Sequence, residues 1–214
     1  MSFHENDERA LHRCLEAPVL IVKDDPKVVE SDLLAGRLRC PGCKKRSLGP
    51  WGFARRRKLR DGTDLRPRRV ACRAAGGCGA THVLLPDTCL ARRRDGAEVI
   101  GGALTAVIAG GEAYTDTACR LGIPPDTLCG WLRRFGRRAA ELVPFFRAWL
   151  VALAPGSPLP EPKGRLASHA LELVGAVARA ASLRLGARPA WSWASALTGG
   201  ALLSNTSSPF VRPT

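Results

Sequence analysis

The sequence predicts an α+β protein: a small β-ribbon held by paired cysteines, then a three-helix unit, then a helical C-terminal segment. Three observations predict this order. Cysteine pairs bracket short β-type segments between residues 40 and 85. Apolar residues recur at helical spacing from residue 99 onward. An Ala-rich stretch near the C-terminus, residues 166–185, shows a further helical pattern and no strand signals.

Residues 1–39 form an acidic strand-helix prelude. Ala17 to Val22 is a short β-type run, and Val28, Val29, Leu33 and Leu34 recur at helical spacing until Gly36. This stretch carries 6 Lys or Arg against 8 Asp or Glu. We expect it to pack on the cysteine module or on the helices beyond.

Residues 40–90 predict the ribbon itself. One strand is expected from Trp51 to Leu59, a return strand from Leu65 to Ala71 after the Asp61-Gly62 turn, and a third from Ala80 to Leu85. Each cysteine pair then lies at a strand end.

Residues 91–150 predict a trihelical helix-turn-helix. The apolar pattern gives a helix to about residue 108, a short helix over 114–121, a turn at Gly122-Ile123-Pro124, and a third helix from Pro125. Proline at a first helical position with Asp126 behind it suits a helix start. Pro144 is expected to kink or end this helix.

The remainder divides into a Pro-rich linker, residues 151–164, and an Ala-rich helical segment with a polar tail, residues 165–214. Cys119 and Cys129, within the helix-turn-helix, are expected to be small packing residues.

The cysteines predict a structural zinc site. Zinc takes four Cys or His ligands in a tetrahedron, and Cys40-Pro41-Gly42-Cys43 is a typical first pair. Cys72 and Cys78 supply the second, but five residues separate them, so His82 is the reserve fourth ligand. The ribbon holds no Glu to act as a general base, which favours structural over catalytic zinc. No βαβ pattern follows the first pair, which disfavours a redox role, and we predict no enzyme activity.

The charge predicts a polyanion partner, most simply duplex DNA. The net charge is +14, and residues 40–94 hold 15 Lys or Arg against 3 Asp or Glu. Phosphate contacts are expected from arginines in and after the ribbon, and groove or phosphate contacts from the third helix. The candidates are Arg55, Arg56, Arg57, Arg68, Arg69, Arg92 and Arg93, and on the helix Thr127, Arg133, Arg134 and Arg137.

The same composition favours a cytoplasmic, nucleoid-associated location. Met1 to Arg9 is polar and acidic, unlike a secretory signal, so the thiols are expected to be reduced. Leu166 to Leu185 is interrupted by charged residues, which predicts no membrane span and no membrane partner.

Several segments together resemble an actinobacterial-type family of unknown function. They are Leu38-Arg39-Cys40-Pro41-Gly42-Cys43, Pro50-Trp51-Gly52, Thr81-His82-Val83-Leu84-Leu85-Pro86, Leu121-Gly122-Ile123-Pro124 and Trp131-Leu132-Arg133-Arg134-Phe135. The resemblance covers roughly residues 17–145 and, more loosely, 202–206. Its members look like the DNA-binding front of insertion-sequence transposases, so it implies zinc on the four ribbon cysteines and DNA as partner.

The sequence departs from that family pattern at Lys44, where glycine is usual, in the longer Cys72 to Cys78 loop, and at Cys129-Gly130, where basic residues are common. We expect a regulator of transcription or of a mobile element. The alternatives are an RNA-binding ribbon, a protein-interaction adaptor, and a defective or partner-dependent transposase subunit. Besides duplex DNA, the expected partners are a second copy of the chain or a transposase-type protein, and no small-molecule substrate is inferred.

Overall fold

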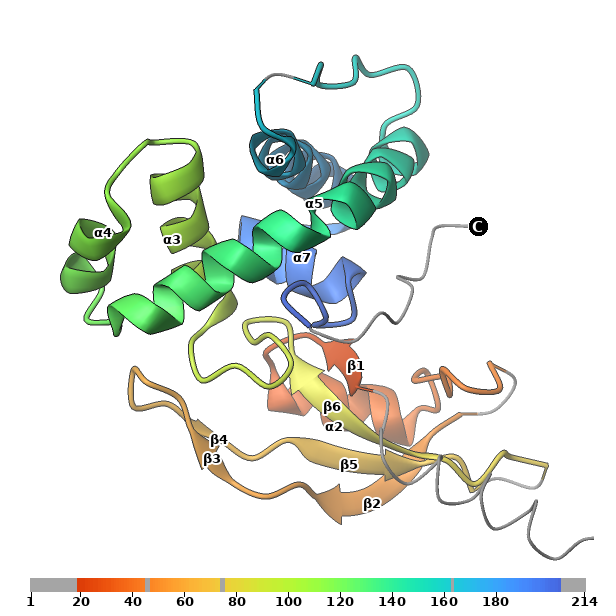
Figure 1. Ribbon diagram of the computed structural model, residues 1–214. Helices are drawn as coiled ribbons and strands as arrows, with labels where there is room; N and C mark the ends of the chain where they lie inside the picture. Colours follow the sequence, from red (N-terminus) through yellow and green to blue (C-terminus); the bar gives the residue numbers. More distant parts are fainter. Residues whose placement is uncertain (1–18, 45–46, 74–75, 163, 205–214) are drawn as a thin grey trace, which may run out of the picture. The chain divides into compact units, whose positions relative to one another are not determined.

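A computed structural model describes residues 19–44, 47–73, 76–162 and 164–204. The chain divides into two compact units, one ending at Pro86 and one beginning at Asp87. We call them the ribbon unit and the helical unit and describe each by itself. The described residues contain both helices and strands (Figure 1), which confirms the predicted α+β class.

The ribbon unit is built on a four-stranded sheet in the order β1-β6-β5-β2. Strands β2, β5 and β6 pair antiparallel, whereas β1 lies parallel to β6. A separate pair, β3 with β4, surrounds the Asp61-Gly62 turn. The bounds are β1 Val19–Val22, β2 Gly49–Phe53, β3 Arg57–Lys58, β4 Asp64–Leu65, β5 Arg68–Ala71 and β6 Thr81–Pro86.

The strand expected from Trp51 to Leu59 is therefore two strands, β2 and β3. The register of β2 on β5 shifts between Pro50 and Gly52, and Gly52 has a φ of 105°, a conformation that favours glycine. A bulge of this kind bends a strand and interrupts its pairing. Sequence periodicity does not reveal it.

The strand-helix prelude belongs to the ribbon unit, because β1 completes the sheet and helix α2, Pro26–Leu34, packs on it. Asp25 caps α2, with Oδ1 accepting from the amides of Lys27 at 2.9 Å and Val28 at 3.2 Å. The buried face of α2 and the sheet share one core, made of Val29, Leu33, Cys40, Leu48, Val70, Cys72 and Leu84.

The helical unit begins with the three predicted helices: α3, Ala97–Ile108; α4, Tyr114–Arg120; and α5, Pro125–Leu153. The turn between α4 and α5 is tight. Gly122 has a φ of 62°, and the Ile123 amide donates to the Ala118 carbonyl at 2.9 Å. Ala118, Ile123 and Leu128 are buried together, which fixes the two helices against each other.

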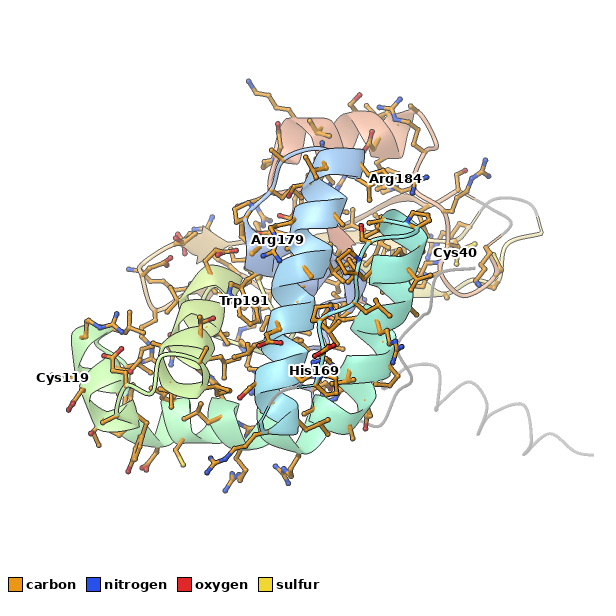
Figure 2. All side chains as sticks on the ribbon, turned by 90° about the horizontal axis from the view of Figure 1, so that it is seen from above. Cys40, Cys119, His169, Arg179, Arg184 and Trp191 are labelled. Carbon is orange, nitrogen blue, oxygen red and sulfur yellow. The ribbon has the colours of Figure 1, made fainter. Side chains whose placement is uncertain are left out.

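Of the two outcomes predicted at Pro144, a kink or an end of the helix, the second does not occur, because α5 continues through Pro144 to Leu153. Pro144 removes one backbone hydrogen bond but bends rather than ends the helix, which changes direction along its length (Figures 1 and 2). Phe145, Phe146 and Leu150 beyond it are buried, and this packing offsets the lost hydrogen bond.

Cys119 and Cys129 do not pack in the core, contrary to expectation. Both side chains are exposed, on α4 and α5 respectively. Each lies one residue away from the buried face, because Ala118 and Leu128 occupy that face instead. None of the cysteines that the structure describes forms a disulfide.

The C-terminal helices are part of the same core as α3 to α5. Helix α6, Leu166–Leu185, packs along α5, and α7, Ala190–Leu197, packs against α6 and α3. Trp191 lies against Gly101 of α3, and Glu98 Oε1 accepts from the amides of Trp191 at 2.8 Å and Ser192 at 3.1 Å. Glu98 thus caps α7 from a different helix.

The Pro-rich segment is a crossover between two parallel helices. Arg184, near the C-terminal end of α6, donates from Nη1 to the carbonyls of Ala152 and Leu153 at the end of α5, both at 3.0 Å (Figure 2). Residues 154–165 must therefore return along a 20-residue helix, about 30 Å long. An extended chain rich in proline covers about 3 Å per residue, which suits this return. Within the described residues, no helix combines the length and the hydropathy required to cross a bilayer.

Candidate metal centre and basic surface

Four cysteines of the ribbon unit converge on one point. The sulfur atoms of Cys40, Cys43, Cys72 and Cys78 all lie within 4.8 Å of one another. The Sγ atoms of Cys40 and Cys78 are 3.6 Å apart, as are those of Cys43 and Cys72. Four sulfurs around one metal ion at about 2.3 Å would be separated by about 3.8 Å. The predicted cluster is confirmed, and it could hold a metal ion.

The two cysteine pairs are closed by the same kind of backbone hydrogen bond despite their different spacing. The Lys44 amide donates to the Cys40 carbonyl at 2.7 Å, and the Gly79 amide donates to the Cys72 carbonyl at 3.0 Å. Both donor residues are left-handed, with φ values of 56° and 71°. The additional residues of the second loop therefore leave the closing hydrogen bond unchanged.

Backbone amides also point at the sulfurs. Those of Gly42 and Cys43 donate to Cys40, and that of Cys78 donates to Cys72. Donors of this kind stabilise a thiolate, which is the form that ligates a metal. Thus the first sulfur of each pair receives the amide of the second cysteine.

Without a cation the thiols resist ionisation. Burial raises the pKa of Cys40, against the lowering effect of the Cys43 and Gly42 amides. The Cys78 amide lowers the pKa of Cys72, but burial and the three neighbouring thiols together raise it to about 12. A bound metal ion would reverse this balance, because a coordinating thiol is deprotonated outright. A metal ion at this cluster would therefore hold the sulfurs in the thiolate form.

His82, the reserve ligand, lies beside the four-sulfur cluster. It is fully buried on β6, and its Nε2 is 3.3 Å from the sulfur of Cys40. This is a hydrogen-bond distance for sulfur, so His82 is placed to orient a ligand. Among the described residues the four cysteines complete a tetrahedral set without it.

The predicted phosphate-contacting arginines of the ribbon unit differ in how free they are. Arg55 and Arg56 are exposed between β2 and β3, where Arg56 pairs through Nη1 with Asp64 at 3.7 Å, and Arg57 is half-buried on β3. Arg69 is half-buried on β5, whereas Arg68 pairs through Nε with Glu30 at 2.8 Å. Arg68 is thus engaged within the fold.

The candidate arginines of the helical unit also include both exposed side chains and side chains engaged within the fold. Arg92 is exposed, but Arg93 donates from Nη2 to the Leu203 carbonyl. Burial and then the charge of Arg134 lower the pKa of Arg93. The half-buried Arg134 lies over Gly130, where a Cβ would come within 2.8 Å of its Nη1. Because this atom is the end of a flexible side chain, a Cβ at position 130 would require only that the Arg134 guanidinium move.

Three candidates remain near the start of α5. Thr127 is half-buried, and Arg133 and Arg137 are exposed one turn apart. They lie away from the buried face formed by Leu128, Trp131 and Phe135. Arg133 and Arg137 therefore present their guanidinium groups on the exposed side of the helix.

The prediction missed two aromatic residues of the basic surface, Trp51 and Phe53. Both are exposed on β2, the edge strand of the sheet, and arginine side chains stack on both rings. The available signal was two aromatic residues two positions apart in a segment surrounded by arginine.

Comparison with known proteins identifies no relative: no protein-family model, curated protein or solved structure matches this chain.

Proposed function

We propose that this protein binds duplex DNA through a zinc-stabilised ribbon and a helix-turn-helix. The observation that carries the proposal is that the four-sulfur cluster lies in a unit with a large excess of Lys and Arg. Four sulfurs with no open position suit structural zinc, and a unit this small gains much of its folding energy from a bound metal. Thiol ligands also require a reducing compartment, in keeping with the cytoplasm.

Charge and exposure indicate different roles in DNA binding for the basic segment and for helix α5. Residues 40–94 carry 15 Lys or Arg against 3 Asp or Glu, and such a surface binds phosphate without reading sequence. Helix α5, entered through the Gly122 turn from α4, offers Arg133 and Arg137 on its exposed face. We assign α5 to the major groove, as the second helix of a helix-turn-helix. A regulator of transcription or of a mobile element fits this arrangement best.

The zinc proposal is tested by metal content and by chelation. Purified wild-type protein should hold one zinc ion per chain, and Cys72→Ser or Cys78→Ser should lose it. His82→Ala should keep the stoichiometry but bind zinc about 10- to 100-fold more weakly, since it removes a contact to a ligand rather than a ligand. Full zinc retention in Cys72→Ser would contradict the four-cysteine site.

The DNA proposal is tested by the salt dependence of binding. Fluorescence anisotropy with a labelled duplex should give an affinity that falls steeply as potassium chloride rises. Arg133→Ala and Arg137→Ala should each weaken binding and reduce the salt slope by about 0.9. Arg179→Ala, an equal charge change at an exposed position on α6 (Figure 2), is the matched control and should have little effect.

Two results would overturn this proposal. One is an affinity for duplex DNA that is independent of salt. The other is displacement of the duplex by structured RNA at equal concentration, which would point to an RNA-binding ribbon instead.

A further inference from the structure

The edge strand β2 carries two exposed aromatic rings, each in contact with arginine. Trp51 is 43% exposed and Phe53 is 48% exposed. Exposed aromatic rings on an edge strand are unfavourable in water and invite association. The exposure of these two rings and their contact with arginine therefore call for a functional explanation.

Trp51 holds the guanidinium of Arg73. The Cζ atom of Arg73 lies 3.3 Å from the centroid of the Trp51 ring, which is direct stacking. Arg73 is otherwise exposed, just beyond Cys72 of the metal cluster. Stacking restricts a long side chain that would otherwise sample many rotamers.

Phe53 holds two guanidinium groups. The Cζ atoms of Arg66 and Arg68 lie 4.5 Å and 4.6 Å from its centroid. Arg68 is anchored further by Glu30 and by the carbonyl of Gly52, to which its Nη1 donates at 3.0 Å. Arg66 is exposed, and its contact with the Phe53 ring orients it.

We propose that Trp51 and Phe53 act as positioning residues that hold Arg73 and Arg66 ready to bind the phosphodiester backbone of duplex DNA. A guanidinium stacked on a ring keeps its N–H edge free, and that edge matches phosphate bidentately. Holding the guanidinium group in place before binding reduces the side-chain entropy that is lost on association. This inference rests on the proposed DNA-binding function and adds a phosphate-binding strip at β2.

The charge of this strip and the arginines that cover the aromatic rings indicate which ligand it binds. Arginine already stacks on both rings, so the rings present guanidinium to a partner rather than a bare surface for a base. A nucleic-acid backbone supplies the complementary negative charge. Base stacking on Trp51 or Phe53 is the competing outcome, and it favours unpaired strands.

The experiment measures affinity and salt slope for full-length, zinc-loaded protein on one random-sequence duplex. Trp51→Leu, Phe53→Leu and Arg73→Lys should each weaken binding about two- to fivefold without changing the salt slope. Arg73→Ala should weaken binding and also reduce the slope by about 0.9. Leu34→Ala, at an 81% exposed position of the same unit, is the control and should match wild type.

The two failures are distinguishable. If wild type shows no salt-dependent binding, the proposed function fails, and this inference fails with it. If wild type binds but Trp51→Leu, Phe53→Leu and Arg73→Lys all match Leu34→Ala, only the inference is overturned. It is also overturned if the aromatic variants lose affinity for a single strand but not for the duplex. Arg73→Lys keeps the test valid if an aromatic variant fails to fold, because Arg73 is exposed.

Discussion

Two adjacent glycines of α3 should respond to alanine in opposite directions. A Cβ added at Gly101 would lie 1.9 to 2.1 Å from three atoms of the Trp191 ring, whereas one added at Gly102 meets nothing within 4 Å. Ordinary carbon contacts are about 3.5 to 4.0 Å. Gly101→Ala therefore requires the indole to move by about 1.5 Å or more.

The indole has little room for such a movement. Trp191 is only 8% exposed, and Glu98 holds its backbone amide. Overpacking costs about 1 to 3 kcal/mol, and expelling a buried tryptophan costs about 3 to 5 kcal/mol. Since the indole has no room to stay in place, the cost of expelling it less a helix-propensity gain of about 1 kcal/mol means that Gly101→Ala should lower the free energy of unfolding by about 2 to 4 kcal/mol. Gly102→Ala should raise it by about 0.5 to 1 kcal/mol.

Urea denaturation followed by tryptophan fluorescence measures this difference, because four of the five tryptophans, all except Trp51, belong to the helical unit. The midpoints of the two variants should move to opposite sides of wild type with the same m-value. Gly101→Ala with wild-type stability would show that Trp191 does not pack on α3. Equal loss in both variants would show instead that α3 does not tolerate side chains at this level, whatever Trp191 does.

Three further predictions concern a cap, a turn and the thiols. Glu98→Ala should destabilise the helical unit by about 1 to 2 kcal/mol in the same assay and Glu98→Gln by less, because the amide oxygen still accepts from the start of α7; an unchanged midpoint for Glu98→Ala would rule out the cap. Lys44→Gly should slow zinc release to a chelator, since Lys44 has a φ of 56° that glycine adopts without strain, and faster release would contradict this. The pKa of Cys72, about 12, lies above the value of about 8.5 for an unfolded thiol. The stability that this thiol contributes to the metal-free ribbon is therefore complete below pH 8.5 and is lost as pH rises toward 12. The zinc-loaded ribbon should instead gain stability with pH, because binding releases thiol protons; melting curves of the two forms that shift in the same direction between pH 7 and 10 would refute this.

The elements that sequence predicts well are those fixed by local chemistry. Asp25-Pro26 gives the start of α2, Gly122-Ile123 the turn before α5, and the apolar spacing the three helices themselves. The four cysteines are also predictable, because few arrangements of thiols in so short a segment suit anything but a metal. Each of these depends on residues close together in the chain.

The elements that sequence does not predict depend on distant partners. Nothing local indicates that β1 pairs parallel with β6, or that Glu98 caps a helix that begins at Ala190. Pro144 lies inside α5 because Phe145 and Phe146 are buried beyond it, a gain that the local rule against proline does not include. Long-range packing decides these cases.

The spacing of the second cysteine pair shows why loop length alone is a poor guide to a metal site. What positions two sulfurs is the hydrogen bond that closes the turn, from the residue after the second cysteine to the carbonyl of the first. Lys44 makes that bond in the first pair and Gly79 in the second, and the four sulfurs converge although the second pair is more widely spaced in sequence. His82, close enough to suggest a replacement ligand, is then available to contact the sulfur of Cys40. A histidine in that position can hydrogen-bond to a sulfur whose place is already fixed by the turn, and so adjust its affinity for the metal. The longer loop and the nearby histidine are therefore compatible with a complete four-cysteine site.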